Sequence, residues 1–140
     1  HYDYIFFDCP PSLNVLTVNA LIASDALIIP LQSEFFALEG LSQLLTSVRE
    51  VRNLGNPGLR IEGVVLTMFD ARNRLSLQVE EDARENLGEL VFKTVIPRNV
   101  RISEAPSFSM PVLSYDSRSK GARAYRALAQ EVLVRRNQSS

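Results

Sequence analysis

The segment GLRIEGVVLTMFD (residues 58–70) sets the fold of this chain. It is a short, mostly apolar run with several β-branched residues, and it begins with Gly58 and ends with Asp70. Runs of this length and composition favour a strand over a helix. Because the apolar stretch from Val64 to Phe69 is interrupted only by Thr67, we expect this strand to be covered on both faces.

Four further runs of the same kind lie on either side of this segment. Each is short and apolar, and each is bounded by proline, glycine, asparagine, aspartate or serine. They are YIFFD (4–8), ALIIPLQ (26–32), LVFKTVIP (90–97) and MPVLSYD (110–116). The sequence therefore predicts five strands.

Amphipathic segments separate the predicted strands. Three of them repeat apolar residues at the spacing of one helix face, and a fourth can begin at Ser12 as its N-cap. We expect the first to end at Gly55 as a left-handed cap, the second to end at Gly88, and the third to begin after Ser119. The apolar positions are Leu41, Leu44, Leu45, Val48 and Val51; Val79, Ala83 and Leu87; Ala122, Tyr125, Ala129, Val132 and Leu133; and Leu13, Leu16, Ala20 and Ala23 after Ser12. This alternation predicts an α/β fold, with a mostly parallel sheet flanked by helices on both faces.

The composition is that of a globular protein. The 140 residues are 46% hydrophobic and 22% charged, with one cysteine and no tryptophan. These values exclude disordered, collagen-like and disulfide-stapled chains, and no apolar run reaches the roughly 18 residues of a membrane span. The length predicts a single domain over residues 1–140.

The net charge of −1 is unevenly distributed. Residues 1–59 hold six acids and two bases, residues 60–97 seven acids and five bases, and residues 98–140 three acids and eight bases. A cationic last third fits an anionic partner, and a solvated helix face followed by a basic tail produces the same pattern.

The predicted strand 4–8 ends in Asp8, at the edge of the sheet where α/β proteins bind ligands. In nucleotide hydrolases an aspartate at this position helps to hold Mg²⁺ on the phosphates. Pro10 and Pro11 then fix the path of the following loop. An aspartate that only ends a strand and caps the next turn fits the same pattern.

Two more strand ends carry residues suited to a nucleotide. Met68 and the neighbouring Phe69 can form one wall of a purine pocket, and the arginines of the loop that follows can contact phosphates. Asn99, after Pro97, can both donate and accept hydrogen bonds, as adenine requires. Core packing beside solvated arginines, and a proline-rich connection between strands, are the alternatives.

Other kinds of chemistry are excluded. The sequence contains neither G-x-x-x-x-G-K-[ST] nor G-x-G-x-x-G, and so it has no phosphate-cradling loop. A single histidine, His1, and a single cysteine, Cys9, exclude a histidine-based triad, a histidine-rich metal site and C-x-x-C chemistry.

Together these segments resemble the ParA/Soj chromosome- and plasmid-partitioning ATPases, a deviant Walker A group that also includes MinD. The string IPRNVRISEAPS is the most specific part of the resemblance. The similar segments are YIFFDCPPSL (4–13), QSEFFALEGLSQLL (32–45), LTMFDARNRLSLQV (66–79) and KTVIPRNVRISEAPSFSMPVLSYDSRSKGARAYRALAQEV (93–132). The resemblance implies a P-loop NTPase-like fold of which this chain is the C-terminal portion, without the Walker A loop.

The resemblance also implies a role for each matching residue. Asp8 would be the Walker B acid that acts on Mg²⁺ through a coordinated water, and Pro10 and Pro11 would belong to the switch that responds to the γ-phosphate. The adenine of ATP would lie among Met68, Asp70, Pro97 and Asn99. Non-specific DNA binding would use Arg72, Arg101, Lys120 and Arg123. We expect Asp8 and Asn99 to lie at the same edge of the sheet.

The implied function is chromosome or plasmid partitioning. ATP and Mg²⁺ would drive homodimerisation and binding to DNA, a ParB-like centromere-binding protein would be the partner, and the protein would be cytoplasmic and associated with the nucleoid. Without the phosphate cradle, we expect the 140-residue chain alone to have no ATPase activity. One alternative is a MinD-like cell-division ATPase at the membrane, which the short polar end VLVRRNQSS disfavours. The other is a truncated module that binds DNA or a partner without hydrolysis.

Overall fold

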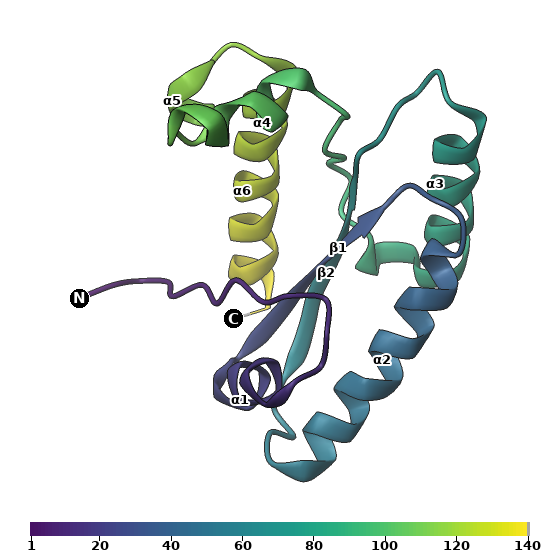
Figure 1. Ribbon diagram of the computed structural model, residues 1–140. Helices are drawn as coiled ribbons and strands as arrows, with labels where there is room; N and C mark the ends of the chain where they lie inside the picture. The colour runs from purple at the N-terminus through teal and green to yellow at the C-terminus, as the bar shows by residue number, and fades with distance from the viewer. Residues whose placement is uncertain (140) are drawn as a thin grey trace.

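Two parallel strands lie at the centre of the computed structural model, which describes residues 1–139 (Figure 1). β1 (Ala26–Gln32) pairs with β2 (Arg60–Thr67), from Ala26 opposite Arg60 to Gln32 opposite Thr67. The register shifts between Leu27 and Ile28. Because the strands are parallel, both end at the same edge of the sheet, at Gln32 and Thr67.

Helices account for most of the remaining chain. Asparagine or serine side chains cap four of them, since their oxygens accept the free N–H groups of the first turn. The helices are α1 (Val15–Ala23), α2 (Ala37–Leu54), α3 (Arg74–Leu87), α4 (Val100–Glu104), α5 (Val112–Tyr115) and α6 (Lys120–Gln138), with 3₁₀ turns η1 (Gly88–Leu90) and η2 (Ala105–Phe108).

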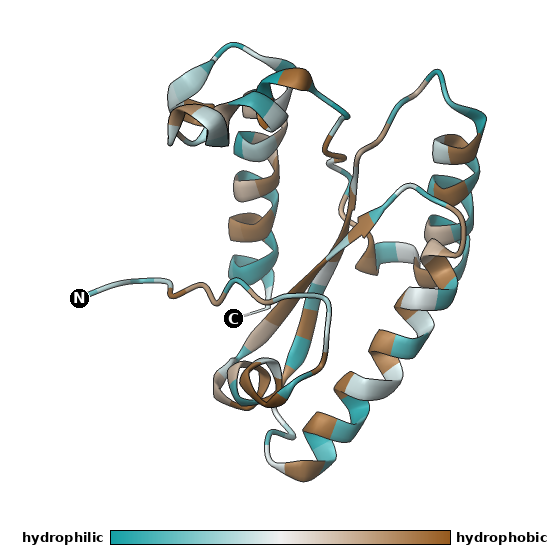
Figure 2. Cartoon of the chain, in the orientation of Figure 1, coloured by the Kyte–Doolittle hydropathy of each residue, from teal (hydrophilic) through white to brown (hydrophobic). Residues whose placement is uncertain are grey.

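The two faces of the strands pack against different helices. Alternate residues of a strand point to opposite faces, so Val64 and Leu66 meet α2 and α3, while Val65 meets the segment around Phe92 and α6. α1 packs against α2, with Leu21 of α1 in contact with the cluster that contains Val48 and Val51 of α2. Figure 2 shows that apolar residues predominate along both strands. The predicted α/β fold with helices on both faces of a parallel sheet is therefore confirmed.

Three of the five predicted strands do not form ladders in the described chain. Residues 4–8 are extended but unpaired, and they run across β1 and β2 instead of alongside them (Figure 1). With no neighbouring strand to pair with, this apolar segment leaves Ile5 and Phe6 about three-quarters exposed. Residues 110–116 fold into the short helix α5, which begins after Pro111.

The predicted strand 90–97 makes only two isolated bridges, Val91 with Val64 and Pro97 with Phe69. Between them, the backbone N–H groups of Phe92 and Ile96 donate to carbonyls of β2 at 2.8 Å, and a side chain of α6 satisfies the residues in the middle. The Glu131 carboxylate accepts the backbone N–H groups of Lys93 and Thr94 at 2.7 and 2.9 Å. This segment thus satisfies part of its backbone without a ladder.

The helix boundaries agree with the expectations except at two caps. Gly88 ends α3 with φ 54°, and Ser119 caps α6 through the backbone N–H of Ala122. Gly55 ends α2 with a φ of −167°, outside the left-handed region, so the predicted left-handed cap there is wrong. Asn14, and not Ser12, caps α1, because the Asn14 side chain reaches the backbone N–H of Thr17.

Candidate functional site

A cavity of about 210 Å³ opens at the edge where β1 and β2 end. Such an edge is where open α/β folds bind ligands. The cavity lies between the strand ends, α4 and α6, and it mixes apolar walls with several amide and hydroxyl groups. It is lined by Gln32, Thr67, Met68, Ile96, Pro97, Asn99, Ile102, Ser103 and Tyr125.

Met68 reaches this cavity through an unusual backbone conformation. Its φ of 54° is in the left-handed region, which residues other than glycine seldom adopt. The chain is held there by parallel pairing: the Phe69 N–H donates to the Ile96 carbonyl at 3.1 Å, and the Arg98 N–H donates to the Phe69 carbonyl at 2.9 Å. These bonds join the two segments that carry Met68 and Pro97, and both residues line the cavity.

Asn99 contributes both to the cavity and to the start of α4. Its Oδ1 accepts the Arg101 backbone N–H at 2.9 Å, so the side-chain oxygen serves as the N-cap. The side-chain NH₂ has no hydrogen bond to the described residues, which leaves it to donate to a ligand. Gly121 of α6 lies close by, because a Cβ placed there would be 3.5 Å from the Asn99 Cγ.

Asp70, the fourth residue predicted around adenine, does not line this cavity. Its carboxylate instead accepts the Arg72 backbone N–H at 3.0 Å and the Arg72 Nε at 3.2 Å. The hydrogen bonds from the Arg72 side chain and backbone hold the pKa of the Asp70 carboxyl below its usual range. Asp70 and Arg72 therefore form a local ion pair on the loop before α3.

The other residues predicted to bind DNA lie on α4 and α6. The Arg101 guanidinium contacts Glu104 at 3.1 Å and Asp116 at 3.4 Å. Hydrogen bonding to Glu104 raises the pKa of Arg101 above its usual value. Lys120 and Arg123 occupy the exposed first turn of α6, the positive end of the helix dipole.

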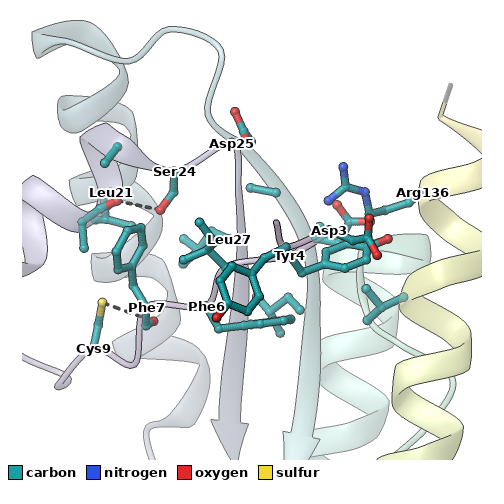
Figure 3. Close-up of a pocket in the computed structure, with 18 residues that line it drawn as sticks. Asp3, Tyr4, Phe6, Phe7, Cys9, Leu21, Ser24, Asp25, Leu27 and Arg136 are labelled. Carbon is teal, nitrogen blue, oxygen red and sulfur yellow. Dashed lines mark hydrogen bonds between the residues drawn. The ribbon is translucent and has the colours of Figure 1, made fainter.

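Asp8 lies away from this group of residues. Its neighbours Phe7 and Cys9 line a second cavity, of about 420 Å³, together with the end of α1 and the start of β1 at Ala26–Ile28 (Figure 3). That is the amino end of β1, whereas Asn99 is at the carboxyl end. The expectation that Asp8 and Asn99 share one edge is wrong for this structure, because residues 4–8 do not enter the sheet. Pro10 and Pro11 are exposed in the same unpaired segment.

Six of the nine residues that line the cavity were not predicted as site residues from the sequence: Gln32, Thr67, Ile96, Ile102, Ser103 and Tyr125. Gln32 ends a predicted strand, so the rule that ligands bind at strand ends could have identified it. Ser103 and Tyr125 lie on α4 and α6, which meet only after folding. Nothing in their local sequence marks them as parts of one site.

The family model for the AAA domain matches residues 1–61. The chain is 60% identical over 134 residues to the chromosome partitioning protein ParA of Caulobacter vibrioides, covering 96% of the chain and 50% of that protein. It is 58% identical over 132 residues to the sporulation initiation inhibitor protein Soj of Bacillus subtilis, covering 94% of the chain and 52% of that protein.

The chain is a relative of the ParA and Soj partitioning proteins. The resemblance predicted from its motifs is confirmed by this identity over nearly all of its length. The chain spans about half the length of these two relatives.

Solved structures support the same fold. The septum site-determining protein MinD of Pyrococcus horikoshii, in complex with Mg-ADP, superposes with a TM-score of 0.72 at 26% identity. The match covers 89% of this chain and 48% of that one. MinD is thus similar in fold but much more distant in sequence than ParA and Soj.

No helix within residues 1–139 has the length and apolar character that a membrane crossing needs. No cluster of three or more histidine, cysteine or acidic side chains in this range could hold a metal ion.

Proposed function

We propose that the protein to which this chain belongs partitions chromosomes or plasmids, through ATP-dependent dimerisation and non-specific binding to DNA. The observation that carries this proposal is the 58–60% identity to Soj and ParA over 94–96% of the chain. In this proposal the partner is a centromere-binding protein of the ParB kind, and the protein acts on the nucleoid in the cytoplasm. We also propose that residues 1–140 belong to a single domain and form the C-terminal portion of the ATPase domain of that protein.

In this proposal the cavity at the strand ends takes the adenine base. Met68, Pro97 and Ile96 offer apolar walls to a flat ring, and the Asn99 NH₂ offers a donor. Asp70 acts beside the base indirectly, by fixing the loop that follows Met68 through its bonds to Arg72. Most binding sites for small molecules combine apolar walls with a few placed polar groups in this way.

Mg²⁺ would be held with the nucleotide phosphates and not by a cage of protein side chains. Mg²⁺ keeps several waters and commonly binds one or two carboxylates plus phosphates, which fits the lack of an acidic cluster in residues 1–139. The motif YIFFDCPPSL offers the carboxylate of Asp8 as the oxygen ligand, through a bridging water, and this role requires residues 4–8 to join the sheet as a strand in the complete protein, which they do not do here. Pro10 and Pro11 would stiffen the switch segment next to it.

The DNA surface in this proposal consists of Arg72, Arg101, Lys120 and Arg123. The last two support it most directly, because two cations at the positive end of a helix dipole reduce helix stability unless an anion is present. Phosphate groups of DNA are such anions, and binding through them is independent of base sequence and falls steeply with salt.

The test uses the complete gene product, with duplex DNA and anionic vesicles as probes. We expect DNA binding that requires ATP, and its loss when Lys120 and Arg123 are both replaced by glutamate while ATP affinity is kept. Binding to vesicles but not to DNA would instead favour the MinD-like alternative, for which the similarity in fold is the supporting observation. DNA binding without any ATP turnover would favour a non-catalytic module, which is also what we expect of the 140-residue chain alone.

A further inference from the structure

We propose that Glu104 and Asp116 hold Arg101 in ion pairs and thereby limit the affinity of the proposed DNA surface for phosphates. In this role the two acids are affinity-setting residues, because they compete with phosphate for one cation. The inference rests on the proposed function and adds a control element to the same surface.

Two carboxylates form ion pairs with different nitrogens of the Arg101 guanidinium. Its Nη1 contacts the Glu104 Oε2 at 3.1 Å, and its Nε contacts the Asp116 Oδ2 at 3.4 Å. Glu104 is the last residue of α4, and Asp116 follows α5 directly, so the two acids come from different elements. These two contacts involve the Nη1 and the Nε of the guanidinium, and any bidentate contact uses at least one of these two nitrogens. A phosphate that binds Arg101 in a bidentate manner must therefore displace one of the carboxylates.

The Glu104 carboxylate is held in place by more than the arginine. The Tyr115 hydroxyl donates to the same Oε2 at 2.9 Å, and the Tyr115 ring stacks on Phe108 with centroids 5.1 Å apart. The hydrogen bond to Glu104 is also the main reason why the pKa of Tyr115 is raised. Because α4, η2 and α5 already order this acid, little conformational entropy remains to be lost when it pairs with Arg101.

The ion pairs are exposed enough to exchange with phosphate. The side chains of Arg101, Glu104 and Asp116 are 52%, 39% and 36% exposed. Ion pairs at such positions are weak and are screened by salt. The restraint therefore lowers DNA affinity by a modest factor without blocking the surface.

The four cations of the proposed DNA surface thus differ in whether they form ion pairs with acidic side chains. Arg101 and Arg72 are paired with acids, Arg72 with Asp70, whereas Lys120 and Arg123 have no ion pair with the described residues. We infer that Lys120 and Arg123 make the first contact with DNA. Arg101 then binds phosphate only by exchanging partners.

The experiment measures binding of a short fluorescent duplex to the complete gene product in the presence of ATP, at several salt concentrations. The test variant is Glu104→Gln with Asp116→Asn, which removes both charges and keeps the side-chain shapes. We expect about two- to fivefold tighter binding at low salt, the size of a typical exposed ion pair, and a steeper dependence of affinity on salt.

Two controls separate this mechanism from a general change in charge. Glu85→Gln with Glu89→Gln removes the same charge from exposed acids in and just after α3, far from Arg101 (Figure 1). Adding Arg101→Gln to the test variant should abolish its gain in affinity, and circular dichroism checks that each variant is folded. An equal gain in the α3 control, or a gain that persists without Arg101, would overturn the inference while leaving the proposed function intact. If neither the wild type nor any variant binds DNA, both proposals fail.

Discussion

Gly121 allows α4 and α6 to meet beside the candidate site. A Cβ at this position would lie 2.4 Å from the Cγ1 and 2.6 Å from the Cδ1 of Ile102, which is too close for carbon atoms. Since Ile102 and Asn99 both line the cavity, the absence of a side chain at Gly121 helps to define the shape of the site.

We therefore expect Gly121→Ala to destabilise the chain by about 1–3 kcal/mol, the typical range for overpacking in a filled core. Gly40→Ala is the matched control, because Gly40 lies in α2 with nothing within 4 Å of an added Cβ. Alanine there should stabilise the chain by about 0.5–1 kcal/mol through helix propensity. Urea unfolding measures both changes, and equal effects of the two substitutions would argue against the close contact between α4 and α6.

At the scale of elements, α6 supports the irregular segment that leads to Pro97 and Asn99. Besides the bonds from Glu131, the Arg135 guanidinium donates to the carbonyls of Glu62, Leu90 and Val91 at 3.1–3.3 Å, and it lies 4.1 Å from the Phe92 ring centroid. Burial alone would raise the pKa of Glu131. The hydrogen bonds from Thr94 and Lys93, with the charge of Arg135, outweigh burial and lower that pKa below 4.5.

A carboxyl group whose pKa is lowered by folding stabilises the fold most fully at pH values above its unfolded pKa. That contribution disappears as the pH falls through the lower, folded value. We expect Glu131→Gln to reduce the free energy of unfolding by about 1–3 kcal/mol at neutral pH, because glutamine offers one acceptor where two N–H groups need one each.

The difference between wild type and Glu131→Gln should then shrink as the pH is lowered below 4.5, as measured by unfolding at a series of pH values. Glu81→Gln on the exposed face of α3 serves as the control. If the difference for Glu131→Gln stayed constant with pH, the Glu131 carboxylate would not be stabilised by folding in the way described.

The same elements show how far sequence could predict this structure. Apolar periodicity and caps located β1, β2, α2, α3 and α6, since these signals are local. The segment 90–97 has the composition of a strand, but only part of its backbone pairs with β2. Distant side chains on α6 satisfy another part, and no local pattern reveals that. Residues 4–8 also look like a strand, yet a strand forms only where a neighbour supplies hydrogen bonds.

The candidate site also contains residues that the sequence could predict and residues that it could not. Met68, Pro97 and Asn99 were predicted because they lie near the ends of apolar runs and match the motifs of the family, and the structure brings these three to one cavity. Ser103 and Tyr125 join them only through the packing of α4 on α6. The pairing of Arg72 with Asp70 and of Arg101 with Glu104 and Asp116 also depends on loop geometry, which residue types alone do not specify.

At the scale of the whole molecule, the structure separates the cavity at the strand ends, which is the proposed nucleotide site, from the cationic side chains on α4 and α6. Asn99 connects the two, because it lines the cavity and also caps the helix that carries Arg101. A base bound by Asn99 would therefore contact the N-cap residue of the helix that presents Arg101. This arrangement would let nucleotide binding affect the DNA surface, and its first requirement is that the cavity binds the nucleotide base.

Asn99→Asp tests that requirement most directly. Aspartate keeps the oxygen that caps α4 but removes the side-chain NH₂, so the fold should persist while the donor to the base is lost. Asn73→Asp is the matched control, because Asn73 caps α3 with the same chemistry, through the Leu75 N–H at 2.8 Å, outside the cavity. In the complete gene product, titration with a fluorescent ATP analogue should show about tenfold weaker binding for Asn99→Asp, the loss of a hydrogen bond worth about 1.5 kcal/mol, and unchanged binding for Asn73→Asp. Equal ATP affinity for wild type and Asn99→Asp would contradict the assignment of this cavity to the nucleotide.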